Sequence, residues 1–204
     1  MAANTDTAED GIMDEQILVA QLRQGDKEAF AVLVTTFQKR LLKVAYGITL
    51  DSEESREIVQ DVFTTVFRKI HSFRQASSLY TWLRKMTVNQ CLNWKRRWKR
   101  RFRWHHDPIT VENDSRLSQE NTQMETPETL MQQKQLKENI MDAVKDLPET
   151  TRTVFVLFAL EELSYAEIAD FLHIRKGTVA SRLYHARKKV AHTLNLKNPR
   201  EKTV

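Results

Sequence analysis

Apolar side chains recur at steps of three and four residues along nearly the whole chain, which is the spacing of one face of an α-helix. Only four glycines and four prolines interrupt this pattern in 204 residues, and no convincing run of alternating β-branched residues indicates a strand. The periodicity therefore predicts an all-α protein.

The first two predicted helices follow an N-terminal segment without a core-forming pattern. Residues 1–13 are expected to be disordered, and a short helix is expected from Asp14. Asp26 is placed to cap a long second helix. The apolar stripe of that second helix is Phe30, Leu33, Val34, Phe37, Leu41, Val44, Ala45 and Ile48.

The third predicted helix has a buried stripe and an acidic face. Asp51 is placed to cap it, with Glu54 at the capping-box distance. Its apolar stripe is Ile58, Val59, Val62, Phe63, Val66 and Ile70. The other face is left for solvent or for a partner and carries Glu53, Glu54, Glu57, Gln60 and Asp61.

A long stretch without acidic residues follows. Residues 62–106 hold twelve Lys or Arg among 45 residues. The aromatic residues interleaved with them are Phe73, Tyr80, Trp82, Trp94, Trp98, Phe102 and Trp104. Positive charge tracks a phosphate backbone, and each base stacked on an aromatic ring is worth about 1–3 kcal/mol. The mixture predicts binding to single-stranded or melted nucleic acid. For the run from Lys95 to Trp104, a solvated helix end with snorkelling side chains is the alternative.

Within this stretch, a polar loop at residues 71–78 leads to a helix predicted over about 79–101, which has two candidate faces. The stripe expected to pack is Leu79, Trp82, Leu83 and Met86. The stripe expected to face DNA is Tyr80, Arg84, Thr87, Cys91 and Lys95. In the loop, Phe73 is either a plug for the core or an exposed ring awaiting a ligand, and the local sequence favours neither.

A second stretch without acidic residues, 171–200, holds eight Lys or Arg and three His. Ser164 and Glu167 stand at capping-box spacing for a short helix, and a tight turn separates it from a second helix that begins near Lys176 or Gly177. This arrangement predicts a helix-turn-helix with its second helix in a major groove, and an ordinary helical hairpin is the alternative.

Composition also divides the chain into two domains. Residues 107–127 are rich in Asn, Thr, Ser, Gln and Glu and predict a flexible linker between domains at 14–106 and 128–198. No glycine-rich phosphate loop or zinc-ligand spacing occurs, so we expect no enzyme activity, no catalytic residues, no metal and no cofactor. A single cysteine and the lack of a signal-peptide pattern favour a cytoplasmic location.

Five segments together resemble one known family. They are Asp51–Phe63, Ser77–Leu83, Val88–Asn89, Ser164–Ala169 and Gly177–Leu183. In this order they are similar to the sigma-70 family of RNA polymerase sigma factors, and more narrowly to its extracytoplasmic-function (ECF) subfamily. The resemblance implies two small helical domains, region 2 at 14–106 and region 4 at 128–198, in a subunit that binds core polymerase, recognises the minus-35 and minus-10 promoter elements and promotes melting.

The resemblance also implies three sets of binding residues. Contact with the clamp helices of the polymerase largest subunit falls on Glu54, Glu57, Gln60 and Asp61. Contact with the minus-10 element, including a flipped base, falls on Phe73, Arg74, Ser77, Arg84, Asn89, Lys95, Arg96 and Arg97. Contact with the minus-35 element falls on Lys176, Thr178, Ala180, Ser181, Arg182, Tyr184, His185 and Lys188. Further implied partners are the flap of the second-largest subunit and an anti-sigma factor, without direct membrane insertion.

Some residues depart from the family pattern. His173 stands where glycine is common and would need the left-handed conformation, and His185 stands where arginine is common and cannot clamp guanine as arginine does. A stand-alone regulator using 164–190 and an RNA-binding protein using 62–106 are the rival functions. Neither rival accounts for the acidic face of the third helix.

Overall fold

The structure is a computed structural model that describes residues 6–101, 135 and 139–197, and the side chains of 15–94, 135 and 139–194. All regular secondary structure in these residues is helical, which confirms the all-α prediction. The chain divides into two compact units, Met1–Ile109 and Thr110–Val204. The predicted linker at 107–127 lies outside the described residues.

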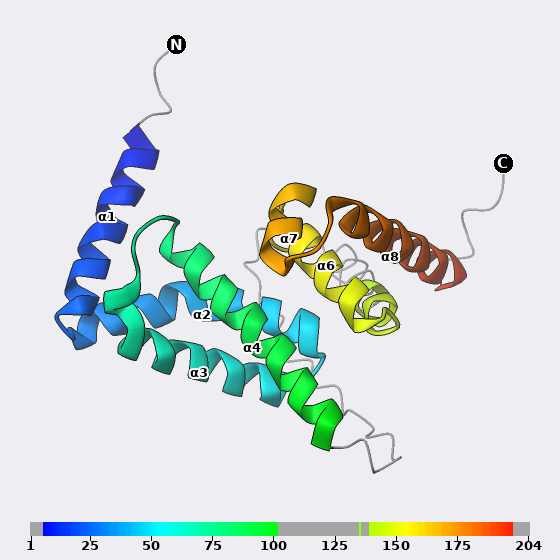
Figure 1. Cartoon of the computed structure of the whole chain (residues 1–204), viewed down its shortest axis with the longest axis horizontal. Coiled ribbons are helices and arrows are strands. Elements are labelled where there is room, and N and C mark those ends of the chain that lie inside the picture. The colour runs from blue at the N-terminus through cyan, green and yellow to red at the C-terminus, as the bar shows by residue number, and fades with distance from the viewer. Residues whose placement is uncertain (1–5, 102–134, 136–138, 198–204) are drawn as a thin grey trace. The chain divides into compact units, whose positions relative to one another are not determined.

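Within its described residues, 6–101, the first unit has four helices and one short 3₁₀ turn (Figure 1). They are α1 (Asp6–Arg23), α2 (Lys27–Thr49), α3 (Ser52–Lys69), η1 (Ile70–Ser72) and α4 (Leu79–Arg101). Helices α2, α3 and α4 pack against one another, and α1 packs on α2 and η1. Helix α1 begins eight residues before the predicted start at Asp14, so the expectation of disorder does not hold for residues 6–13.

Aspartate caps fix the starts of the two helices that form the centre of this unit. Asp26 accepts hydrogen bonds from the backbone N of Glu28 and of Ala29, at 2.7 and 3.2 Å. Asp51 accepts one from the backbone N of Glu54 at 3.0 Å. Each carboxylate satisfies amides that the first helical turn leaves unpaired, as predicted. The helices therefore begin where their apolar stripes face each other.

The predicted stripe of α3 is buried throughout, and α2 buries Leu33, Leu41, Val44, Ala45 and Ile48. Phe30 is half-buried and meets the ring of Phe63 edge-on, with centroids 6.4 Å apart. Phe63 is 6% exposed, which confirms its assignment to the core.

The second unit contains α6 (Glu149–Ala159), α7 (Tyr165–Leu172) and α8 (Lys176–Lys197), which pack on one another. Residues 139–145 are also helical. Arg152 is buried and donates from Nη1 to the carbonyl of Lys145 at 3.2 Å, which satisfies one of the last carbonyls of that segment. Burial lowers the pKa of Arg152, and the nearby carboxylate of Glu149 acts in the opposite direction.

The helix-turn-helix formed by α7 and α8 has the predicted capping box and left-handed turn. Ser164 and Glu167 form a full capping box, in which Glu167 N donates to Ser164 Oγ at 3.3 Å and Ser164 N donates to Glu167 Oε2 at 2.8 Å. His173 ends α7 in the left-handed conformation, at φ 54° and ψ 47°. Ile168, Val179 and Leu183 are fully buried, so α7 and α8 share one core.

Replacing His173 by glycine should stabilise the second unit, because glycine adopts φ near 54° without the clash that a Cβ introduces. We expect a gain of about 1 kcal/mol in the free energy of unfolding, measured by chemical denaturation. His173→Val is the matched control and should lose stability, because a β-branched side chain is the least tolerant of this conformation. Equal stability of both variants would contradict this account of the turn.

Candidate nucleic-acid interface

Helix α3 presents its acidic face to solvent. Glu53, Glu57, Gln60 and Asp61 are exposed, and Glu54 is half-buried near the first turn. The buried stripe of the same helix turns these residues away from α2 and α4. The face is therefore available to a partner, as the sequence predicts.

The segment between η1 and α4 is an exposed loop, residues 74–78, held between two buried side chains. Arg74, Ser77 and the residues between them are exposed, and Gln75 has φ 54°. Phe73 before the loop is 3% exposed and Leu79 after it is fully buried. The loop thus projects from two anchored ends.

Phe73 belongs to the core of the first unit. Its ring lies 5.0 Å from the ring of Trp82, with 31° between their planes. Of the two roles that the sequence leaves open, the structure supports the plug. A ring that is 3% exposed cannot stack on a base without leaving the core, so the assignment of Phe73 to the DNA-contacting surface is corrected.

The face of α4 that was expected to meet DNA is also buried. Tyr80 and Arg84 are 8% and 7% exposed, and Thr87 and Cys91 are fully buried. The ring of Tyr80 stacks on Phe37 of α2 at 5.8 Å and lies under the guanidinium of Arg40 at 3.9 Å. Arg84 lies 5.7 Å from the same ring and is itself buried, so the prediction that it faces DNA was wrong.

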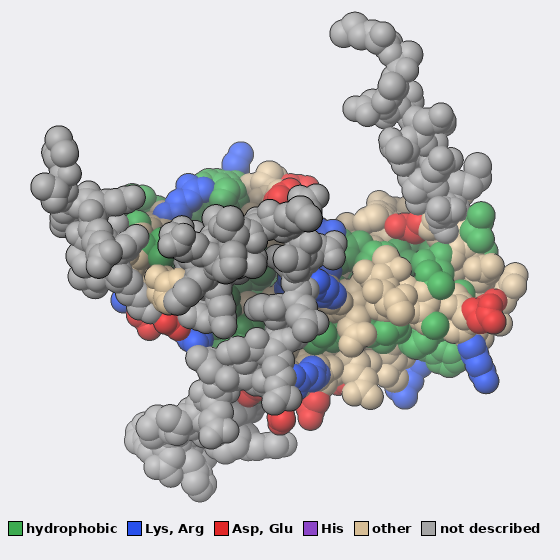
Figure 2. All heavy atoms as spheres, turned by 180° about the vertical axis from the view of Figure 1, so that it is seen from behind, with side chains coloured by type: hydrophobic (Ala, Val, Ile, Leu, Met, Phe, Trp, Pro, Cys, Tyr) green, Lys and Arg blue, Asp and Glu red, His purple; other side chains and the backbone are tan. Residues whose placement is uncertain are grey.

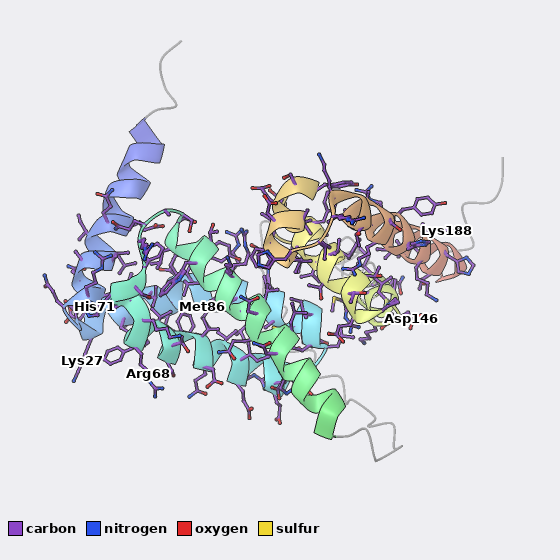
Figure 3. The ribbon with its side chains drawn as sticks, in the orientation of Figure 1. Lys27, Arg68, His71, Met86, Asp146 and Lys188 are labelled. Atoms are coloured by element: carbon purple, nitrogen blue, oxygen red, sulfur yellow. The ribbon has the colours of Figure 1, made fainter. Side chains whose placement is uncertain are left out.

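The exposed stripe of α4 is a different one. Lys85, Asn89 and Asn93 are exposed at four-residue spacing, and Met86 beside them is half-buried (Figure 3). Asn89 is one of the predicted site residues, whereas Lys85 and Asn93 are exposed on the same face and were not predicted. Their spacing from Asn89 was the signal that could have identified them, because residues four apart share a helix face. The predicted contacts Lys95, Arg96 and Arg97 lie in α4, but their side chains are outside the described residues.

Helix α8 presents the predicted set of side chains in two neighbouring rows. Ala180, Tyr184 and Lys188 form one row, and Ser181 and His185 form the other, all exposed. Tyr184 is 63% exposed, and its ring meets that of His185 edge-on with centroids 5.5 Å apart. Lys176 is exposed as well, whereas Thr178 and Arg182 are half-buried at the border of this surface.

Other basic residues of α8 serve its packing. Arg187 lies 4.8 Å from the ring of Phe158 and donates from Nη1 to the hydroxyl of Tyr165 at 3.3 Å. Lys189 pairs with Asp146 at 3.5 Å. Figure 3 shows Lys188 near the C-terminal part of α8. The basic residues of this helix thus divide into an outward set with Lys188 and a set, Arg187 and Lys189, that contacts other residues of the same unit.

The side-chain types exposed on the first unit can be followed in Figure 2. On that face, apolar and uncharged atoms cover much of the unit and charged side chains lie mainly near its edges.

Among the residues that the structure describes, no group of three or more His, Cys, Asp or Glu could hold a metal ion. Within the same residues, no helix is both long and apolar enough to span a bilayer.

Comparison with known proteins agrees with this two-unit arrangement. Residues 33–101 match the family model for sigma-70 region 2, and residues 137–190 match that for sigma-70 region 4. The chain is 33% identical to the ECF RNA polymerase sigma-E factor of Haemophilus influenzae, over 89% of this chain and 96% of that protein. It is 30% identical to the RNA polymerase sigma-H factor of Pseudomonas aeruginosa, over 88% and 93%.

A solved structure shares the fold. The sigma factor RpoE of Bartonella quintana, in complex with the anti-sigma factor NepR, superposes with a TM-score of 0.62 at 19% identity. The match covers 81% of this chain and 96% of that chain.

Phe73→Ala should lower the stability of the first unit by about 3–5 kcal/mol, because it leaves a cavity against Trp82. Chemical denaturation measures this cost. Phe73→Leu, which refills most of the volume without an aromatic face, should lose less stability and keep nucleic-acid binding near the wild-type level. If Phe73→Leu were as stable as wild type but lost binding to single-stranded DNA, the ring would be a stacking platform after all.

Lys188→Ala should make binding of α8 to duplex DNA less dependent on salt, because one exposed cation is removed from the outward rows. We expect the slope of log affinity against log salt to become shallower by about one. Lys189→Ala is the matched control, since this neighbour pairs with Asp146, and its slope should stay close to wild type. Identical slopes for both variants would refute the division of α8 into two sets.

Proposed function

Because the chain belongs to the ECF group of sigma-70 RNA polymerase sigma factors, we propose how its surfaces divide the work of transcription initiation. The first unit binds core polymerase and holds the melted minus-10 element. The second unit anchors on the minus-35 element. The relatives are sigma factors rather than enzymes, so the chemistry of transcription belongs to the polymerase.

The observation that carries the proposal is the separation of charge between the exposed surfaces of one chain. The exposed face of α3 carries Glu57 and Asp61, whereas the outward rows of α8 carry Lys188 and no carboxylate. An acidic face repels DNA and suits a basic protein partner. We assign the α3 face, with Glu54 and Gln60, to the clamp helices of the largest polymerase subunit.

Minus-10 recognition is assigned to the loop 74–78 and the exposed stripe of α4. Arg74 and Lys85 supply positive charge, while Ser77 and Asn89 supply hydrogen-bonding groups suited to base edges or phosphates. Residues 62–106 contain no acidic side chain, so no carboxylate of this segment repels the phosphate backbone of DNA. Melting follows when unpaired bases are held more tightly here than paired ones.

Minus-35 recognition is assigned to the outward rows of α8. A helix-turn-helix places its second helix in the major groove, where Ser181, Tyr184 and His185 reach base edges and Lys176 and Lys188 reach phosphates. Tyr184 offers an apolar ring edge for a thymine methyl group, and Ser181 offers a hydrogen bond to any base. Arg182, at the border, is placed for the backbone.

Regulation and location are assigned by likeness to relatives. The Bartonella sigma factor was solved with an anti-sigma factor, and we propose a partner of that kind for this chain. We also propose a cytoplasmic location, because RNA polymerase acts there. The flap of the second-largest subunit is the proposed polymerase contact of the second unit.

Charge reversal on α3 tests the assignment of the polymerase face. Glu57→Lys should weaken association with core polymerase at least tenfold and abolish run-off transcription, because it places like charge against a basic partner. Duplex DNA binding by the free chain should not weaken. Association is measured by fluorescence anisotropy and transcription by run-off from genomic promoter DNA.

Glu28→Lys is the matched control, because Glu28 is an exposed glutamate on a neighbouring helix of the same unit. Its association with core polymerase should remain within about twofold of wild type. Equal losses in the two variants would show that total charge, not the α3 face, governs association. Failure of the wild-type chain to give any promoter-dependent product would refute the proposed function itself.

A further inference from the structure

Helix α1 is bonded to both ends of the exposed loop 74–78. At the loop's start, Arg23 Nη2 donates to the carbonyl oxygen of Phe73 at 2.7 Å. At its end, the backbone N of Leu79 donates to Glu15 Oε1 at 2.8 Å. The loop lies alongside α1 in Figure 1, and these two bonds link residues 50 and 64 positions apart in the sequence.

The two side chains stand on one face of a single rigid element. Glu15 and Arg23 are eight residues apart, so they are separated by about 12 Å along the helix axis. Val19 and Leu22 lie between them and are buried, which fixes the rotation of α1 against the rest of the unit. The helix therefore sets how far apart the two ends of the loop are held.

Each bond satisfies a backbone group that the loop would otherwise leave to solvent. Leu79 N is in the first turn of α4, where amides have no helical partner, and the helix dipole favours a carboxylate there. Ser78 Oγ accepts from Thr81 N at 3.2 Å and completes the same turn. The Glu15 carboxylate thus fixes the residue at which the loop becomes helix.

The Arg23 contact is a charge-assisted hydrogen bond to one defined backbone atom. Arg23 is half-buried, so its side chain is partly shielded from solvent. A charged donor makes a stronger hydrogen bond to a carbonyl than a neutral donor does. Its Nη2 holds the carbonyl of Phe73, immediately before the exposed residues of the loop.

We propose that α1 is a splint that preorganises loop 74–78 for the unpaired minus-10 strand, with Glu15 and Arg23 as positioning residues. This inference rests on the proposed function and extends it to a helix outside the residues that match region 2, which begin at 33. A loop already ordered in the free chain loses less conformational entropy when it binds, so capture of a flipped base is tighter. Neither Glu15 nor Arg23 needs to touch DNA.

The test compares Glu15→Ala and Arg23→Ala with the conservative Glu15→Gln and Arg23→Lys. Each is assembled with core polymerase on a promoter that the wild-type holoenzyme melts. Three quantities are measured: affinity for core polymerase, the fraction of open complex by permanganate reactivity, and the amide hydrogen-exchange rates of residues 74–79 in the free chain.

We expect both alanine variants to lower the open-complex equilibrium about tenfold, as the loss of one charge-assisted hydrogen bond does. Their core affinity should stay within about twofold of wild type, and exchange at Leu79 should accelerate in Glu15→Ala. Glu15→Gln keeps an acceptor oxygen and should retain most of the melting. Gln16→Ala, at the exposed neighbouring position on α1, is the matched control and should behave as wild type.

Two results would overturn the splint. One is wild-type melting and exchange in both alanine variants, and the other is a parallel loss of core affinity and melting, which indicates general damage to the unit. If Arg23→Ala folds poorly, Arg23→Lys, which keeps the charge and a donor, distinguishes loss of the hydrogen bond from general damage to the unit. If the wild-type chain melts no promoter, the proposed function fails, while hydrogen exchange in the free chain still decides whether α1 holds the loop.

Discussion

Helix α4 is packed on two sides, against α2 and against α3, and the functional surface of the first unit depends on this constraint. The buried residues Leu79, Tyr80, Leu83, Arg84, Thr87, Val88 and Cys91 cover more than one stripe of the helix. Among the described side chains of α4, the exposed ones are Lys85, Asn89 and Asn93, which form a narrow row. The double packing thus limits which side chains of α4 can reach nucleic acid.

The same packing explains why polar atoms can be buried along α4. Thr87 returns its hydroxyl to the carbonyl of Leu83 at 3.0 Å, so a hydrogen bond replaces water. Arg84 lies near the ring of Tyr80, which also contacts Phe37 and Arg40 of α2. A cation near an aromatic face retains part of the electrostatic stabilisation that it loses on leaving water. These contacts join α4 to α2 and hold the loop before α4 in register.

Local signals in the sequence were sufficient to predict most of the described helices and their caps. Asp26, Asp51 and the Ser164–Glu167 pair begin helices where predicted, because capping depends on residues only two or three positions apart. The exposed rows of α8 followed from the same kind of short-range pattern, whereas the left-handed turn at His173 was expected from the family resemblance. The acidic face of α3 could be predicted as well, since one strong apolar stripe determined its opposite side.

What the sequence could not provide were contacts between distant segments. Tyr80, Arg84, Thr87 and Cys91 were assigned to the DNA-facing stripe by their helical spacing, yet all four are buried, and Tyr80 stacks on Phe37 of α2. Phe73 could not be placed until Trp82 was seen beside it. The bonds from Glu15 and Arg23 to the loop span 64 and 50 residues and leave no periodic signal. Such pairings exist only once the chain has folded.

The central claim is that the exposed loop of the first unit is preformed and receives an unpaired base while the core beneath it stays intact. A cryo-electron microscopy structure of the chain with core polymerase and melted promoter DNA tests this most directly. The account predicts an unpaired base against residues 74–78, with Phe73 still packed on Trp82 and Glu15 still bonded to Leu79. A base stacked on a Phe73 that has left the core, with α1 detached from the loop, would contradict it.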